Sequence, residues 1–224
     1  RMYPDYISAK KMRESYEGNV FSPMGCRSFL SPRKDENGNY KFDGRFNMGV
    51  VSFNLPQIGI LADGDEEKFF QILHKRLELC KKALLLRVEL LKKITSDVSP
   101  IHWQYGAISR LKPGESIEKF MYGGYATLSL GYIGMYEATL LTKGVSHTTP
   151  EGKRFAHRIM DDLNEHIKKW REETNIGFAL YGTPAESLTH RFCQKDRSRF
   201  GNIKDVTDKG YYTNSYHVDV REPI

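Results

Sequence analysis

The sequence is poor in cysteine, and the few cysteines that it has build no framework. Cys26, Cys80 and Cys193 are spread over 224 residues without a C-x-x-C pair, which excludes a disulfide-rich scaffold and a cysteine zinc knuckle. The seven histidines show no metal-binding spacing such as H-E-x-x-H, so we assign no metal site from the sequence. This cysteine usage is typical of a reducing, cytoplasmic compartment.

Long apolar runs and runs of basic residues are also missing. No signal peptide is recognisable, and no stretch reaches the roughly 18 apolar residues of a membrane-spanning helix, so we expect no membrane association. The net charge of +6 suits an anionic ligand such as a nucleotide. A nucleic-acid-binding arm would contain a run of about five or six basic residues. The sequence has no such run, so we expect no nucleic-acid partner.

What is present is an ordinary share of apolar residues, arranged in an α/β pattern. A long amphipathic helix is predicted over about residues 65–95, where apolar side chains recur at spacings of three and four. Pro56 is expected to end the first strand. This order of elements implies parallel strands joined by crossover helices. The predicted strands are 49–54, 125–130, 176–182 and 211–220, and the other predicted helices lie within 3–18, 115–121, 134–144, 151–173 and 183–201.

One candidate site follows the third strand, because active sites of parallel α/β folds gather at the carboxyl ends of strands. Thr183, Pro184 and Glu186 fit the N-cap, first and third positions of a helix, which is a T-x-x-E capping box. The same helix start offers backbone N–H groups to a phosphate. Both interpretations remain open at this point. The candidate substrate-binding residues of this stretch are Gly182, Thr183, Pro184, Ala185, Glu186 and Ser187.

Two asparagines and one cysteine are further candidates. Asn47 just precedes the first strand, and Asn54 lies inside it or ends it. Such an amide either orients a substrate hydroxyl or satisfies turn backbone. Cys26 lies in "PMGCRSFL", where Arg27 is the only local feature that lowers a thiol pKa and no histidine base is near. The residues alone therefore do not decide what Cys26 does.

Taken together, five stretches resemble the anaerobic (class III) ribonucleoside-triphosphate reductases, and the resemblance covers essentially the whole chain. It implies an α/β fold that is part, the C-terminal half, of a ten-stranded α/β barrel of the glycyl-radical enzyme type, with a finger loop that carries a cysteine. It also implies reduction of ribonucleoside triphosphates to 2′-deoxyribonucleoside triphosphates. The stretches are "PMGCRSFL", "DGRFNMGVVSFNLPQIGI", "GGYATLSLGYIGMYEA", "YGTPAESLTHRF" and "YYTNSYHVDVRE".

The resemblance gives the candidate residues roles. Cys26 matches the cysteine that carries a transient thiyl radical and takes hydrogen from C3′ of the ribose. Asn47 resembles the asparagine that contacts the ribose hydroxyls, with Asn54 as the alternative, and Arg27 is a candidate substrate contact. The stretch 182–187 resembles the loop and helix start that hold the substrate phosphates. Cys80 and Cys193 lie in helical context and do not match the family's second catalytic cysteine.

The resemblance also implies what lies outside this segment. Residues 1–224 are expected to be a single segment of the catalytic barrel domain, and the chain opens without methionine and stops after a strand-like run. The regulatory N-terminal domain and the C-terminal region, with its radical glycine and zinc site, have no counterpart here. We therefore expect no cofactor within this segment and no turnover from it alone. The expected partners are a ribonucleoside triphosphate, a radical-SAM activating enzyme that generates the glycyl radical, and a second copy in a homodimer.

Three other functions stay open. Another glycyl-radical enzyme, of the pyruvate formate-lyase or dehydratase type, would carry adjacent cysteines or a cysteine and glutamate pair, whereas Cys26 is followed by Arg27. A non-catalytic basic module would bind nucleotides through its charge, with binding that weakens steeply with salt. A structural subunit would use Cys26 only for packing.

Overall fold

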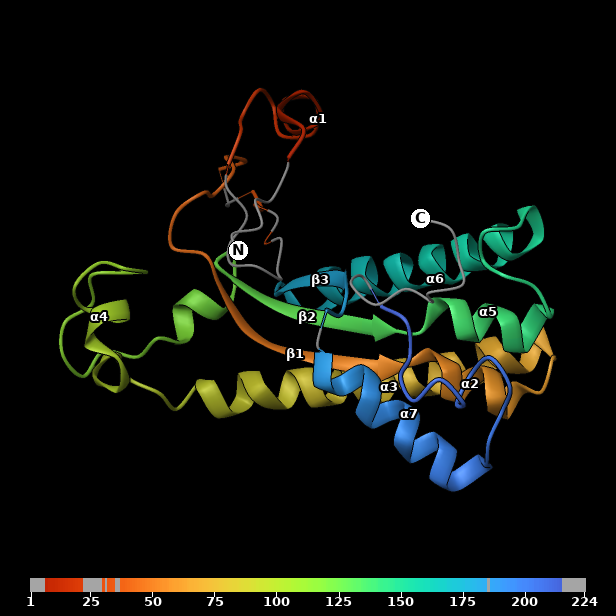
Figure 1. Ribbon diagram of the computed structural model, residues 1–224. Coiled ribbons are helices and arrows are strands. Elements are labelled where there is room, and N and C mark those ends of the chain that lie inside the picture. Colours follow the sequence, from red (N-terminus) through yellow and green to blue (C-terminus); the bar gives the residue numbers. More distant parts are fainter. Residues whose placement is uncertain (1–6, 22–29, 31, 35–36, 185, 215–224) are drawn as a thin grey trace, which may run out of the picture. The chain divides into compact units, whose positions relative to one another are not determined.

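The computed structural model describes residues 7–21, 30, 32–34, 37–184 and 186–214 (Figure 1). No helix in this part of the chain is long and apolar enough to cross a membrane. Two short 3₁₀ helices, Ser96–Val98 and Glu118–Met121, accompany the main elements. In chain order these are α1 (Ala9–Ser15), β1 (Phe46–Asn54), α2 (Leu55–Ala62), α3 (Glu66–Leu91), α4 (Pro100–Trp103), β2 (Ala126–Ile133), α5 (Met135–Lys143), α6 (Pro150–Thr174), β3 (Gly177–Gly182) and α7 (Glu186–Phe200).

The three strands form one parallel sheet in the order β1-β2-β3, with β2 in the centre. Helices α2 and α3 lie in the connection from β1 to β2, and α5 and α6 lie in the connection from β2 to β3. In Figure 1 the arrows of β1 and β2 point the same way. The predicted α/β class and parallel strands are therefore confirmed, and three of the four predicted strands lie within a few residues of their expected positions.

Two predictions about the strands need correction. Pro56 does not simply end β1, because the strand ends at Asn54 and Pro56 occupies the first turn of α2, where no helical N–H bond is lost. The predicted strand at 211–220 is not formed over residues 211–214, and its remainder lies outside the described residues. Thr213 instead bonds to the start of α5: its N–H donates to a Glu137 carboxylate oxygen (2.9 Å) and its carbonyl accepts from Gly134 (2.8 Å).

The chain divides into two compact units, and each strand begins in the first and ends in the second. The first unit takes its residues from Arg1–Gly49, Arg87–Ser129 and Trp170–Ala179, and the second takes Val50–Leu86, Leu130–Lys169 and Leu180–Ile224. The amino-terminal residues of the strands therefore belong to the first unit and the carboxyl-terminal residues to the second.

A chain of aromatic rings, two of them buried and two half-buried, lies in the first unit. The ring of Trp103 lies 5.2 Å from that of Phe46 and 5.7 Å from that of Phe120, which in turn lies 5.1 Å from Tyr125. These centroid separations are typical of favourable aromatic pairs. The chain of rings joins the amino-terminal ends of β1 and β2 to α4 and the second 3₁₀ helix.

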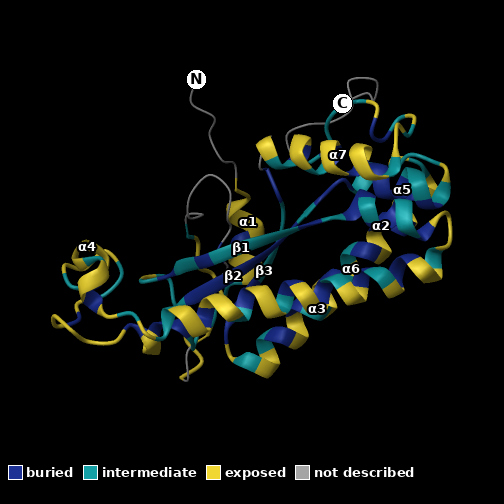
Figure 2. Cartoon of the chain, turned by 90° about the horizontal axis from the view of Figure 1, so that it is seen from below, coloured by how far each residue is buried: buried dark blue, intermediate teal, exposed yellow. Residues whose placement is uncertain are grey.

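The second unit is built on helix packing. The predicted stripe of the long helix is buried: Phe69, Leu73 and Leu77 of α3 are fully inaccessible, and Phe69 meets Phe155 of α6 at 5.2 Å. Helix α2 packs closely on α5, since a Cβ added to Gly59 would lie 3.0 Å from Leu141 Cβ. Figure 2 shows buried positions along the strands and exposed ones on the outer turns of α3 and α6. The long helix thus follows its hydrophobic period, as predicted.

Candidate active site

At the carboxyl end of the sheet, in the second unit, two side-chain hydroxyls contact each other over a glycine of the central strand. Ser52 Oγ of β1 and Thr183 Oγ1, just after β3, lie 2.7 Å apart. The residue between them on β2 is Gly131, where an added Cβ would lie 2.0 Å from Thr183 Oγ1 and 2.5 Å from Ser52 Oγ. Only glycine leaves this space. The hydroxyl pair therefore bridges the two outer strands across the central one.

Thr183 continues the strand rather than starting the helix. Its N–H donates to the carbonyl of Tyr132 on β2 (3.0 Å), and its hydroxyl contacts Ser52. Helix α7 begins at Glu186, two residues later than the predicted first helical position, Pro184. This differs from the capping box predicted for Thr183 and Glu186, because a residue still held in the sheet directs its side chain across the sheet.

The rest of the 182–187 stretch surrounds the start of α7. Gly182 is the last residue of β3, and Pro184 is buried. Ser187 lies exposed in the first turn of the helix. Ala185 and the side chain of Glu186 lie outside the described part of the structure. A strand thus ends at Gly182 and a helix begins at Glu186, and phosphate binding between them stays a prediction.

Asn54 is held in a buried polar network centred on Asp196 of α7, which is 1% exposed. Its Oδ1 accepts the N–H of Gln57 at 3.2 Å and so caps α2. Its Nδ2 donates to Asp196 Oδ2 (2.6 Å), and Gln57 Nε2 donates to Asp196 Oδ1 (2.6 Å). The hydroxyl of Tyr212 also donates to Asp196 (2.9 Å), and burial together with this carboxylate raises the pKa of Tyr212. Both ends of the Asn54 amide are therefore used by the fold.

A groove of about 400 Å³ lies beside this network. Arg76 of α3 reaches into the network from this side and donates to Gln57 Oε1 at 2.8 Å. The groove combines an apolar wall with the polar groups of the network. Its lining comes from β1, α2, α3 and α7, and includes Val51, Phe53, Asn54, Gln57, Arg76, Leu79, Cys80, Ala83, Phe192 and Asp196.

In the first unit, Asn47 is the second residue of β1 and so lies within the strand, not before it. Its Nδ2 donates to Ser129 Oγ on β2 (3.0 Å), and its Oδ1 accepts the N–H of Gly49 (2.7 Å). Gly49 has a φ of +152°, and a Cβ there would lie 2.7 Å from Arg87 Cδ. The amide of Asn47 is thus oriented by a strand neighbour and by its own backbone.

Cys26 and Arg27 lie outside the described residues, and the structure specifies contacts for the residues that flank this stretch. Before it, the Phe21 ring packs on Tyr16 at 4.9 Å. After it, Leu30 is 2% exposed and its carbonyl accepts a hydrogen bond from the guanidinium of Arg45. Arg33 donates to the carbonyl of Ile176 at 2.6 Å. Burial lowers the pKa of both arginines.

The two other cysteines occupy packing positions. Cys80 and Cys193 are buried and not disulfide-bonded, and the Cys193 thiol donates to the carbonyl of Thr207 at 3.5 Å. Burial raises the pKa of each thiol to about 11. Because the thiolate is the nucleophilic form, neither side chain is suited to polar thiol chemistry near neutral pH.

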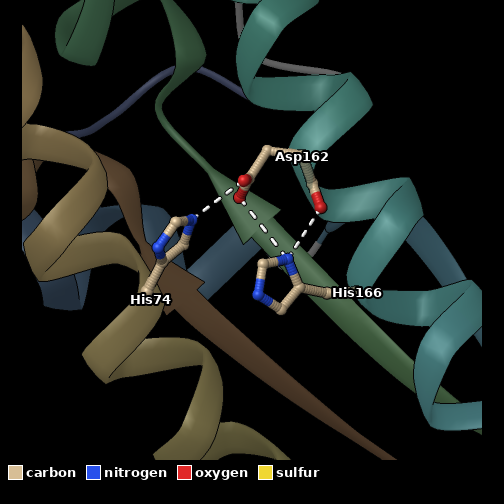
Figure 3. Close-up of side chains that lie close together, drawn as sticks. All are labelled: His74, Asp162 and His166. Carbon is tan, nitrogen blue, oxygen red and sulfur yellow. Dashed lines mark hydrogen bonds and ion pairs between the residues drawn. The ribbon is translucent and has the colours of Figure 1, made fainter.

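Sequence reasoning missed one cluster of chemically active side chains, formed by His74, Asp162 and His166 (Figure 3). Asp162 and His166 are four residues apart on α6, which places them on one face of the helix. His74 is separated from Asp162 by 88 residues, so no local motif joins the three. The i, i+4 pair was the only signal available.

Comparison with known proteins supports the resemblance. The model of the anaerobic ribonucleoside-triphosphate reductase family matches residues 1–224. The anaerobic ribonucleoside-triphosphate reductase of Enterobacteria phage T4 is 45% identical over 230 residues, covering 100% of this chain and 36% of the relative. The enzyme of that name from Escherichia coli K12 is 41% identical over 227 residues, covering 100% of this chain and 32% of the relative.

Solved structures agree. The anaerobic ribonucleotide reductase from Thermotoga maritima in complex with dATP and CTP has a TM-score of 0.59 and 26% identity, over 82% of this chain and 29% of that one. The same reductase with glycerol in the active site gives a TM-score of 0.60 and 26% identity, over 82% and 28%. The chain spans about a third of the length of the curated relatives that it matches. It belongs to the anaerobic ribonucleoside-triphosphate reductase family.

Proposed function

We propose that this chain is the substrate-reducing part of an anaerobic ribonucleoside-triphosphate reductase, which makes 2′-deoxyribonucleoside triphosphates as DNA precursors. The observation that carries the proposal is the family match over the whole chain, residues 1–224. The parallel sheet with its crossover helices is the arrangement expected for a segment of the ten-stranded barrel. Within the proposal, the barrel is completed by regions of the protein outside this segment.

In the proposed reaction, Cys26 acts as a thiyl radical that takes the hydrogen atom from C3′ of the ribose. This step forms the Cys26 thiol and a carbon radical, and it activates departure of the 2′-hydroxyl as water. Two electrons from an external reductant and two protons complete the net reduction, and return of the hydrogen atom from Cys26 to C3′ regenerates the thiyl radical. A radical cysteine needs no low pKa, but it needs a fixed loop. The nearest described residues on either side, Phe21 and Leu30, pack against the Tyr16 ring and in the core respectively.

The geometry supports Asn47, not Asn54, as the ribose contact. Asn54 caps α2 and bonds to Asp196, so its release would cost the fold both interactions. Asn47 is oriented by Ser129 and Gly49 without taking part in a cap. A side chain that is already fixed in one rotamer binds a sugar hydroxyl at lower entropic cost.

We assign the substrate phosphates to the strand-to-helix turn of residues 182–187. Helix α7 has 15 residues, and the N–H groups and positive end of its dipole suit an anion at Glu186 and Ser187. Gly182 allows close approach of a ligand to the backbone. The net charge of +6 is opposite in sign to that of the substrate phosphates. Thr183 contributes indirectly in this proposal, because its bonds to Ser52 and Tyr132 hold the turn in place.

The proposal extends to partners that lie beyond this chain. A radical-SAM activating enzyme would generate the glycyl radical, and that radical and a zinc ion would be held by a region outside this segment. The working protein would be a cytoplasmic homodimer. The unpaired thiols of Cys80 and Cys193 agree with a reducing compartment.

The test compares Cys26→Ala with the wild type in the protein at its full natural length, activated anaerobically by its activating enzyme. The glycyl radical is recorded by EPR, and product formation is measured with a ribonucleoside triphosphate. We expect a normal glycyl signal and no reduction. Cys80→Ala is the matched control, since it removes a buried thiol, and it should retain reduction. Reduction by Cys26→Ala at a rate near that of the wild type would remove Cys26 from the mechanism.

A further inference from the structure

Three potential metal ligands that the proposed reaction does not use converge between α3 and α6 in the second unit. His74 extends from α3 toward Asp162 of α6, and His166 lies one turn further along α6 (Figure 3). One ligand atom from each of the three residues lies within 4.8 Å of the other two. The two imidazole rings are 5.0 Å apart between centroids.

The distances suit a metal ion after small side-chain movements. His74 Nε2 lies 2.8 Å from Asp162 Oδ1, and His166 Nδ1 lies 3.6 Å from Asp162 Oδ2. In a tetrahedral site with bonds of about 2.1 Å, ligand atoms are roughly 3.4 Å apart. The observed separations fall on both sides of this value, and ligation through His166 Nδ1 would replace the hydrogen bond that this nitrogen donates to the backbone carbonyl of Asp162 (2.8 Å).

One carboxylate oxygen of the cluster is buried without a hydrogen-bond donor among the described residues, and a bound cation would stabilise it. Asp162 Oδ2 is buried, yet it accepts no hydrogen bond from any residue that the structure describes. A buried carboxylate oxygen without a donor is unfavourable, because the water that it loses is not replaced. A cation placed between the two imidazoles would supply the missing partner.

The set of donors selects the kind of ion. Two imidazole nitrogens and one carboxylate favour a borderline ion such as Zn²⁺, whereas Mg²⁺ and Ca²⁺ prefer oxygen ligands. Three protein ligands also leave a position for water. The ion can enter from solvent, because the side chain of His74 is 48% exposed while that of Asp162 is 20% exposed.

We propose that His74, Asp162 and His166 bind a divalent metal ion of the zinc class, which fastens α3 to α6. The two helices already meet through Phe69 and Phe155. A metal bond at the cluster adds a second, directional link between them. This site uses none of the residues proposed to bind or reduce the substrate, so it stands independently of the proposed function.

The test titrates Zn²⁺ into the metal-free protein at its full natural length and measures the number of bound ions by calorimetry. His74→Gln and Asp162→Asn each remove one ligand at a partly exposed position, and His157→Gln is the matched control, an exposed histidine of α6 outside the cluster. Any zinc site elsewhere in the protein is common to all variants and cancels. We expect each cluster variant to bind one Zn²⁺ fewer, or to bind that ion at least tenfold more weakly, while His157→Gln matches the wild type.

A second measurement, the melting temperature, distinguishes loss of metal binding from loss of folding. Zn²⁺ should raise the melting temperature of the wild type and of His157→Gln, and should do so less for His74→Gln and Asp162→Asn, whose melting without metal reports their folding. Equal stoichiometry, affinity and melting shifts in all variants would mean adventitious metal only. The cluster would then be an ion pair between two helices and the proposal would fall.

Discussion

The two asparagines of β1 occupy very different surroundings. Asn54, at the carboxyl end of the strand, belongs to a network that joins β1, α2, α7 and Tyr212 through the buried carboxylate of Asp196. Asn47, near the amino end, donates to the hydroxyl of Ser129 on the adjacent strand and accepts the N–H of Gly49, two residues away. The difference teaches that residue type and membership of the same strand do not predict how an amide is bonded in the fold.

The largest effect on stability is expected where the Asn54 network is broken at its centre. Asp196→Ala would leave the buried hydroxyl of Tyr212 and the half-buried amides of Asn54 and Gln57 without their acceptor. We expect a loss of about 3–5 kcal/mol, because each unpaired buried donor costs about 1–3 kcal/mol and some will find water. Urea-induced unfolding measures the loss. Lys195→Ala, at the neighbouring position on α7, is the control and should change stability by less than about 1 kcal/mol.

A smaller loss of stability is expected when a side chain is added at Gly131 of the central strand, β2. Gly131→Ala would place a methyl group 2.0 Å from Thr183 Oγ1, and such overpacking costs about 1–3 kcal/mol. The double variant Gly131→Ala with Thr183→Ala should recover part of this loss, because it removes the clashing hydroxyl. Thermal unfolding of the single and double variants checks both statements. Strict additivity of the two changes would show that the contact does not determine the cost.

The comparison of the two asparagines is sharpened by replacing each with alanine. Asn54→Ala removes an N-cap and one donor to Asp196, so we expect a loss of about 2 kcal/mol in stability. Asn47→Ala should cost less than about 1 kcal/mol but lower turnover of the activated protein about 100-fold, since the ribose loses its orientation. Turnover and unfolding are measured on both variants. Wild-type turnover in Asn47→Ala would reverse the assignment of the ribose contact.

The smallest expected effect on stability comes from the buried thiol of Cys80, through its raised pKa. The pKa of Cys80 is raised from 9.0 to about 11, so above pH 9 the unfolded chain loses this proton while the folded chain keeps it. The folded state then binds more protons, and stability falls as the pH rises from 9 toward 11. Between pH 8 and 10 the loss should be about 1 kcal/mol smaller in Cys80→Ala than in the wild type. Urea titrations at the two pH values test this, and an identical pH dependence would contradict it.

Much of the fold could be predicted from the sequence because its signals are local. The stripe from Phe69 onward fixes α3, and Gly144 ends α5 with a φ of +70°. Helix α2 was missed because a proline directly after a strand indicates a break, although proline is also favoured in the first turn of a helix. Residues 211–214 alternate like a strand, but the backbone of Thr213 finds its partners at the start of α5.

The candidate site was less predictable, since its interactions join distant parts of the chain. No sequence feature near Asn54 predicts its hydrogen bond to Asp196, and none near Asp162 predicts its hydrogen bond to His74. The side chain of Thr183 matched a capping box by spacing, yet Ser52 and the glycine at position 131 direct its hydroxyl across the sheet. Spacing along the chain identifies candidates for a role, and the tertiary fold chooses among them.

The Asp196 network also has a consequence for the rate at which the protein folds. Its bonds to Asn54 and Gln57 span 142 and 139 residues, so they close very large loops in the chain. We infer that such long-range contacts form after β1 and α7 have been brought together, because the loop must close before they can form. Substitutions in the network should therefore leave the refolding rate nearly unchanged and accelerate unfolding. On this inference the network contributes chiefly to slow unfolding of the native state.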